Sequence, residues 1–254
     1  MKIKYYLINP TGNITIISDT PVEPALQPEI AKKLMELEPT AEQVGFLNGS
    51  SLRMAGGEFC GNASMSAAAL IYRNSGKNSG EITLSVSGAE EEIRISIAES
   101  DSGFIGTVTM PKAEAIENRE FEFEGRTYSL PTVKFSGITH IISENVLDKA
   151  TAEAAVRKWC DDLGCDCIGI MLLDIENNRL NPLVYVRTAG TLFWESSCAS
   201  GTSAVGAYIS KQRNKPVELS LTEPGGILRV NADKEKITLC GNVKILTEKE
   251  VIFD

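Results

Sequence analysis

The sequence predicts an α+β protein built from two similar, pseudo-symmetric lobes, each rich in β-strands. Three observations support this fold class: segments of the first half recur in the same order in the second, most patterned segments are typical of strands, and few are typical of helices. A single long duplication indicates two lobes, whereas many short repeats would indicate a solenoid or propeller. The chain has 254 residues, 43% of them hydrophobic, which is enough to bury a sizeable core.

The internal repeat is visible in three pairs of segments. They are PTGNITIIS (10–18) with FSGITHIIS (135–143), EQVGF (42–46) with DCIGI (166–170), and LSVSGAEEEIRI (84–95) with LSLTEPGGILRV (219–230). The first pair aligns Gly12 with Gly137 and Thr15 with His140. We therefore expect an N-terminal lobe over 1–118 and a C-terminal lobe over 119–254, each containing one copy.

Alternating or β-branched runs such as NITIIS, EITLSVSG and VELSLTEPG predict the strands. Helical patterns occupy 27–38, 61–73, 151–163 and 199–212. The charged segment 112–127 contains a turn at EGR, so it is either the crossing between the lobes or a solvated hairpin.

Composition excludes several classes of function. The formal net charge of -9 would repel a phosphate backbone, so we expect no nucleic-acid partner. The sequence has no apolar run of about 20 residues and no signal-peptide pattern at its N-terminus, so we expect no membrane partner and a cytoplasmic location. In that reducing compartment the six cysteines are expected to be thiols rather than disulfides.

Two of these cysteines precede segments with a helical pattern. Cys60 comes before GNASMSAAALIY, and Cys198 comes before ASGTSAVGAYIS. A thiol at the N-terminus of a helix lies near a partial positive charge, which lowers its pKa toward neutrality. The sequence therefore predicts two thiols that can exchange protons near pH 7.

The same helix ends offer backbone N–H groups that can hold a carboxylate. These groups belong to Gly61, Asn62, Ala199, Ser200 and Gly201. If the two thiols flank one cleft, an amino acid held there by its carboxylate can lose its α-proton to one sulfur and receive a proton from the other on the opposite face. This arrangement favours racemisation of a small-molecule amino acid substrate.

At these residues the chain resembles the diaminopimelate epimerase-like superfamily of cofactor-independent racemases and epimerases. The family's two cysteine motifs correspond to CGN at Cys60 and CASG at Cys198, and its G-N segment corresponds to NPTGN, which places Asn13 at the substrate. The resemblance implies lobes that each wrap a β-rich sheet or barrel around a central helix, catalysis by Cys60 and Cys198, and no cofactor or metal. It also implies a possible homodimer.

Within that superfamily the chain looks like the histidine racemase branch, which implies interconversion of L- and D-histidine for metallophore biosynthesis. Diaminopimelate epimerase carries an E-R-G segment whose arginine grips the distal carboxylate, and no arginine lies between Arg187 and Cys198 here. A diaminopimelate epimerase, or a racemase of another amino acid, stays the alternative.

Three further residues fit a substrate with one amino and one carboxyl group. We expect Glu195 and Glu42 to pair with the ammonium group of the substrate. His140, the single histidine of the chain, is expected to accept a hydrogen bond from that ammonium or from the substrate ring.

Two other classes of function compete with an enzyme. Cys160, Cys165 and Cys167 lie close together in WCDDLGCDC, but their spacing lacks the paired C-x2-4-C pattern of structural zinc sites. A catalytically inactive interaction protein of the same fold is the other candidate, and the retention of both thiols argues against it.

Overall fold

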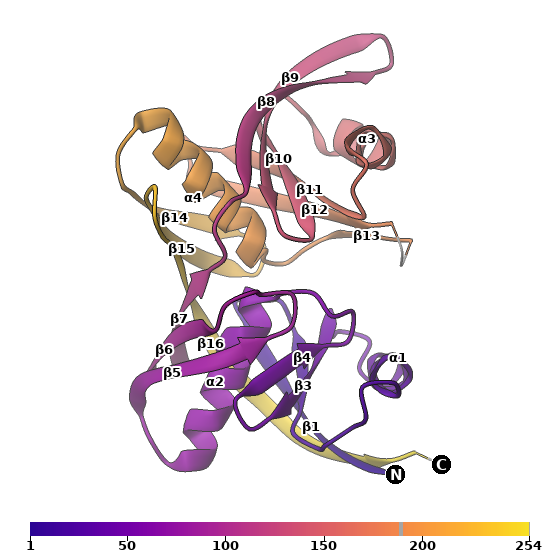
Figure 1. Ribbon diagram of the computed structural model, residues 1–254, viewed down its shortest axis with the longest axis vertical. Coiled ribbons are helices and arrows are strands. Elements are labelled where there is room, and N and C mark those ends of the chain that lie inside the picture. The colour runs from indigo at the N-terminus through magenta and orange to yellow at the C-terminus, as the bar shows by residue number, and fades with distance from the viewer. Residues whose placement is uncertain (188–189, 254) are drawn as a thin grey trace. The chain divides into compact units, whose positions relative to one another are not determined.

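The computed structural model describes residues 1–187 and 190–253. Within them it is a mixed α and β structure, mostly strand, with four helices (Figure 1). The helices are α1 (Gln27–Leu37), α2 (Gly61–Ser75), α3 (Lys149–Leu163) and α4 (Ala199–Arg213). Each coincides with one of the four predicted helical segments, which confirms those predictions. None of the helices found in these residues is long and apolar enough to cross a membrane.

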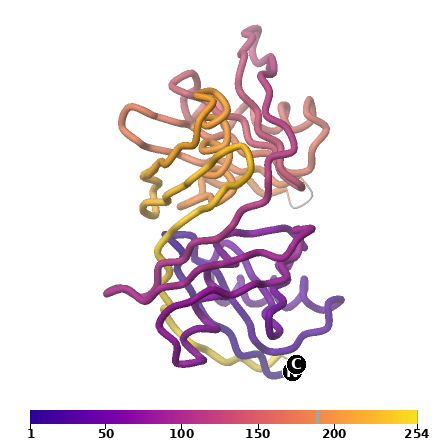
Figure 2. The backbone as a smooth tube through the Cα atoms, turned by 60° about the vertical axis from the view of Figure 1, so that its left-hand side comes forward, coloured from indigo at the N-terminus to yellow at the C-terminus, as the bar shows by residue number. Residues whose placement is uncertain are grey.

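The chain folds into two compact units. The first contains Met1–Thr109 and Cys240–Asp254, and the second contains Met110–Leu239. This division differs from the expected boundaries of 1–118 and 119–254. The reason is that the last strand, β16 (Ile237–Ile252), pairs with the first strand, β1 (Lys2–Pro10), and so returns the end of the chain to the first unit. The two termini consequently lie beside each other (Figure 2).

The first unit is a closed ring of eight strands. They pair in the order β1 to β7 and then β16, and the pairing of β16 with β1 closes the ring. The remaining strands are β2 (Thr15–Ser18), β3 (Gln43–Asn48), β4 (Ser51–Met54), β5 (Ser79–Val86), β6 (Ile93–Ser100) and β7 (Gly103–Met110). Closure removes the exposed strand edges that would otherwise invite pairing with other chains.

The core of this unit is α2. Its residues 61–70 are all buried, and the helix contacts β1, β2, β4, β5 and β6. Such burial requires small side chains, which the alanine and serine run provides. A methyl group at Gly106 would lie 3.0 Å from the Met65 side chain, so the glycine lets β7 approach the helix. Gly76, in the left-handed conformation, ends the helix.

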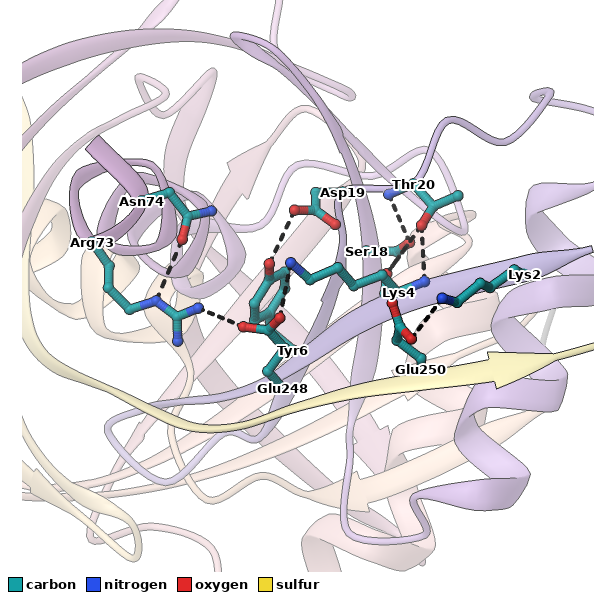
Figure 3. A network of polar contacts seen from close by, with 10 residues as sticks. All are labelled: Lys2, Lys4, Tyr6, Ser18, Asp19, Thr20, Arg73, Asn74, Glu248 and Glu250. Carbon is teal, nitrogen blue, oxygen red and sulfur yellow. Dashed lines mark hydrogen bonds and ion pairs between the residues drawn. The ribbon is translucent and has the colours of Figure 1, made fainter. Parts of the chain in front are cut away.

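Ion pairs on the surface join β1 to β16 (Figure 3). Lys4 pairs with Glu248 at 2.9 Å, and Lys2 pairs with Glu250 at 2.8 Å. Arg73, near the end of α2, also contacts Glu248 at 2.9 Å. Opposite charges on neighbouring strands favour this register, although exposed pairs add little stability because water and salt screen them.

The second unit is a sheet that packs on two helices. Its strands pair in the order β15, β14, β12, β11, β10, β9, β8, with β13 beside β12. Their bounds are β8 (Ala115–Phe123), β9 (Arg126–Phe135), β10 (Ile138–Glu144), β11 (Cys167–Asp174), β12 (Arg179–Val186), β13 (Thr191–Trp194), β14 (Val217–Glu223) and β15 (Gly226–Ala232). The largely buried α4 contacts β9, β10, β11, β14 and β15, and α3 packs on β11 and β12. The buried Trp159 of α3 contacts the rings of Phe121 and Phe123 on β8 and of Tyr128 on β9.

The charged segment 112–127 forms one side of a hairpin. Strands β8 and β9 pair antiparallel along their length, and the turn at Glu124 and Gly125 has positive φ at both residues. Of the two expectations for this segment, the hairpin is therefore the one that is confirmed.

Candidate functional site

Cys60 is the N-cap residue of α2. Its backbone is extended, and its sulfur accepts a hydrogen bond from the Ala63 N–H at 3.3 Å. The Ser64 N–H bonds to the Cys60 carbonyl oxygen at 3.0 Å, so the helix begins as predicted. Gly61 and Asn62, two of the predicted amide donors, occupy the buried first turn. The thiol therefore lies at the positive end of the helix dipole.

A chain of side-chain amides connects Cys60 to two other predicted residues. The Cys60 thiol donates to Gln43 Oε1 at 3.1 Å. Gln43 Nε2 donates to Asn13 Oδ1 at 2.6 Å and to Thr15 Oγ1 at 2.9 Å. Asn13 Nδ2 in turn donates to Glu42 Oε2 at 2.6 Å. Asn13 is buried and Glu42 is exposed, so the network runs from the thiol to the surface.

Sequence reasoning selected Glu42 from EQVGF and missed its neighbour Gln43. The missing information is the parallel pairing of β2 with β3, which sets Gln43 opposite Thr15. The repeat segments around Thr15 and Gln43 were both recognised, so pairing them as adjacent strands is the signal that would have identified Gln43.

The turn at Gly88 supports the segment that leads to Cys60. Gly88 has φ +73°, and a methyl group there would lie 2.2 Å from Phe59 N and 2.6 Å from the Glu58 carbonyl carbon. The preceding Ser87 hydroxyl donates to the Glu58 carbonyl at 2.9 Å. Two main-chain segments thus touch, and neither can move away as a flexible side chain could.

We expect Gly88→Ala to destabilise the protein far more than Gly49→Ala. Gly49 has φ +58° but nothing within 4 Å, so alanine there costs only backbone strain, about 1–2 kcal/mol. At Gly88 the same strain is joined by a clash with main-chain atoms, which adds about 1–3 kcal/mol. Urea denaturation of the two variants measures the difference, and equal costs would contradict the contact.

Cys198 is the N-cap residue of α4 and repeats the geometry of Cys60. Its sulfur accepts a hydrogen bond from the Gly201 N–H at 3.3 Å, and the Thr202 N–H bonds to its carbonyl oxygen at 2.9 Å. Ala199, Ser200 and Gly201 form the first turn, as predicted. The Gly201 amide, expected to hold a carboxylate, instead donates to the thiol.

The pKa of Cys198 is shifted in the direction opposite to the expected one. Burial raises the pKa of this thiol well above its usual value, and the charges of Glu195 and Glu223 raise it further. The hydrogen bond between Cys198 and Ser200 lowers the pKa but is a smaller effect. Desolvation therefore outweighs the helix dipole, and Cys198 holds its proton at neutral pH.

His140 contacts Cys198 indirectly. Its Nε2 lies 3.0 Å from Ser200 Oγ, which lies 3.6 Å from the Cys198 sulfur. The ring has no exposed surface, and Nδ1 has no hydrogen-bond partner among the described residues. The parallel pairing of β10 with β11 sets His140 opposite Gly169, where a methyl group would lie 2.3 Å from Nδ1. The ring is thus enclosed with Ser200 as the partner of Nε2, and the expected hydrogen bond between His140 and the substrate stays a prediction.

Burial lowers the pKa of His140 to about 3, so His140 should make stability depend on pH. The imidazole has a pKa near 6.5 in the unfolded chain, so below pH 6.5 the unfolded chain binds a proton and the folded protein does not. The free energy of unfolding therefore falls by about 1.4 kcal/mol per pH unit as the pH drops below 6.5. Burial raises the pKa of Glu223 to about 8. This group has the opposite effect, so its contribution to stability falls as the pH rises from about 4.3 to about 8.

The variant His140→Asn removes the histidine contribution to the pH dependence of stability and keeps that of Glu223. We expect its free energy of unfolding to increase relative to wild type as pH is lowered from 6.5 to 5, measured by urea denaturation at each pH. The same pH dependence in both proteins would contradict a buried, neutral His140.

The cysteines of the zinc alternative make other contacts. The Cys160 thiol donates to the Cys165 carbonyl oxygen at 3.0 Å, and the two sulfurs are 3.8 Å apart. Across residues 1–187 and 190–253, no group of three or more histidine, cysteine or acidic side chains is arranged to hold a metal ion.

Each unit thus presents one thiol that caps a buried helix, with carboxylate or amide partners. Cys198 keeps its proton at neutral pH, and the Cys60 thiol donates a hydrogen bond to the neutral Gln43 amide. A thiol can act as an acid and its thiolate as a base, so this pair of groups can perform acid–base chemistry.

Known proteins that are similar to this chain are named histidine racemases. A family model, the histidine racemase CntK N-terminal domain, matches residues 2–251. A histidine racemase from Fusobacterium nucleatum is 32% identical over 265 residues, which cover 98% of this chain and 96% of that protein. A histidine racemase from Staphylococcus aureus is 26% identical and covers 91% of this chain and 89% of its own.

Solved structures share the fold at low sequence identity. A probable proline racemase from Agrobacterium radiobacter K84 has a TM-score of 0.72 at 13% identity, covering 99% of this chain and 93% of that one. A hydroxyproline epimerase from Agrobacterium vitis has a TM-score of 0.69 at 13% identity, covering 98% and 92%.

Proposed function

Because this chain belongs to the histidine racemase family, we propose that it interconverts L- and D-histidine without a cofactor, using Cys60 and Cys198 as an acid–base pair. The chain is an isomerase of the racemase and epimerase type. The observation that carries the mechanism is the matched pair of thiols, each an N-cap whose sulfur accepts an amide hydrogen bond at 3.3 Å from the third residue of its helix.

In the proposed reaction one sulfur, as thiolate, takes the α-proton of histidine. The other, as thiol, gives its proton to the opposite face of the resulting carbanion. One C–H bond breaks and one forms, and the enzyme ends with its proton on the other sulfur. Because the two thiols accomplish both proton transfers, the scheme requires no electrophilic cofactor or metal.

The charge that develops on the substrate needs stabilisation. As the α-proton leaves, negative charge spreads into the carboxylate, and the first turns of α2 and α4 provide aligned N–H groups near each thiol. We assign substrate contacts to Asn13 and Glu42, which share the network of Cys60, and to Glu195, whose charge acts on Cys198. Carboxylates in these places suit the substrate ammonium group.

We further propose that the two units are pseudo-symmetric lobes of the diaminopimelate epimerase-like kind. Support comes from the repeated segments and from two 15-residue helices that begin directly after a cysteine. The product would serve metallophore biosynthesis, as the resemblance implies.

Solvent-exchange NMR tests the reaction and the substrate together. The protein is incubated with L-histidine in heavy water, and the α-proton signal and the enantiomer ratio are followed. With two bases, the first D-histidine formed should carry deuterium while the remaining L-histidine still carries protium.

The matched controls are diaminopimelate, proline and the other L-amino acids. Exchange with histidine alone supports the proposal. Exchange with diaminopimelate alone would overturn the choice of substrate, and early D-histidine that retains protium would overturn the two-base scheme.

A further inference from the structure

Glu223 is a buried carboxyl group that the proposed proton transfers do not use. It is the last residue of β14 and only 3% exposed. Its Oε2 accepts a hydrogen bond from the Cys198 backbone N–H at 2.7 Å, and its Oε1 accepts one from the Thr202 hydroxyl. The carboxyl group therefore joins the N-cap residue Cys198 to Thr202 in the first turn of α4.

Within residues 1–187 and 190–253, no cation compensates the charge of Glu223. The titratable groups that act on it are the Glu195 carboxylate and the Cys198 thiol, and no lysine or arginine of the described residues forms an ion pair with it. Both hydrogen bonds survive a change of protonation, since the protonated acid can donate to the Thr202 hydroxyl oxygen. The two hydrogen bonds of Glu223 are thus kept in both protonation states, whereas the charge of its carboxyl group changes with pH.

The two buried groups ionise in a fixed order. Burial raises the pKa of Glu223 to about 8, and that of Cys198 lies higher still, well above its usual value. Glu223 is consequently already negative at any pH where Cys198 titrates. Two neighbouring negative charges disfavour each other, so the carboxylate makes the thiol harder to ionise.

We propose that Glu223 is a positioning residue for Cys198, which holds the first turn of α4 through two hydrogen bonds and, at the alkaline pH where its carboxyl group is ionised, keeps the proton on the thiol through its negative charge. The inference rests on the proposed function for its meaning, because a Cys198 that keeps its proton serves as the proton donor, whereas Cys60 must first lose its own proton to serve as the base. The two thiols of the reaction are then chemically unequal.

Carbon-13 NMR of the full-length protein tests this without substrate. The cysteines are labelled at Cβ, whose chemical shift distinguishes thiol from thiolate, and the Cys198 signal is assigned by its absence in Cys198→Ser. In Glu223→Gln, which preserves the shape and removes the charge, the Cys198 titration midpoint should fall by about 1 pH unit or more. The Cys60 midpoint should not move.

Two variants separate charge from structure. Glu223→Asp keeps a carboxylate and should restore a high Cys198 midpoint, while Glu218→Gln removes an exposed charge from the same strand and should have no effect. An unchanged Cys198 midpoint in Glu223→Gln, or an equal shift in Glu218→Gln, would overturn the proposal.

A pH titration of the wild-type protein tests the proposal without any variant. The amide nitrogen of Cys198, bonded to Glu223, should show an inflection near pH 8 as the carboxyl group ionises. Its absence would overturn the proposal even if Glu223→Gln fails to fold.

Because none of these measurements requires turnover, a protein that lacks racemase activity but shows the expected titrations would refute the proposed function alone. In an active enzyme, Glu223→Gln should also shift the alkaline limb of the kcat/KM profile to lower pH.

Discussion

Replacing Cys60 or Cys198 by serine is expected to abolish racemisation, lowering kcat for histidine by at least about a thousandfold. Serine preserves the N-cap hydrogen bond, because its hydroxyl oxygen can accept from the Ala63 or Gly201 amide as the sulfur does. It cannot exchange a proton near neutral pH, so the helix should remain and the proton transfer should be lost. Chiral chromatography of the product measures the rate, and urea denaturation verifies that the fold is intact.

The two variants should differ in what they retain. Each keeps the thiol that serves one face of the α-carbon, so each can exchange the α-proton of at most one enantiomer with heavy water, and the two variants should prefer opposite enantiomers. Cys240→Ser, which changes a half-buried thiol assigned no role, is the control and should leave racemisation unchanged. Full activity in either catalytic variant would refute the two-thiol mechanism.

Local features of the site could be predicted from the sequence. Cys60 and Cys198 are followed by small residues with a helical pattern, and helix starts depend on neighbouring residues, so both N-caps and their first turns were found. The four helices follow from the same local periodicity.

Long-range features could not be predicted. Gln43 reaches Cys60 only because β2 and β3 pair in parallel, and Glu223 reaches Cys198 from a strand 25 residues away. The pKa of Cys198 depends on how many groups bury it, which the motif does not encode. The unit boundaries were missed for a similar reason, since β16 pairs with the opposite end of the chain.

Gly201→Ala should impair catalysis through the thiol rather than through the fold alone. A methyl group at Gly201 would lie 2.2 Å from Met171 Sδ and 3.1 Å from the Cys198 sulfur. Either the Met171 side chain or the first turn of α4 must then shift. Because Met171 is fully buried, we expect the turn to move and the bond from the Gly201 amide to the sulfur to break. We expect a stability loss of about 1–3 kcal/mol and a decrease in kcat of roughly a hundredfold.

Gly206→Ala is the matched control in the same helix. Its methyl group would lie 2.7 Å from Val230 Cγ2, so it should also destabilise the protein, but no contact there involves the thiol. At a temperature where both variants are folded, Gly206→Ala should retain activity and Gly201→Ala should not. Adding Met171→Ala removes the nearest clashing atom, so the double variant should be more stable than the sum of the single effects predicts, by about 1–3 kcal/mol. Strict additivity would mean that Met171 does not confine the first turn, and equal activity in the two glycine variants would mean that the cap hydrogen bond does not position the sulfur.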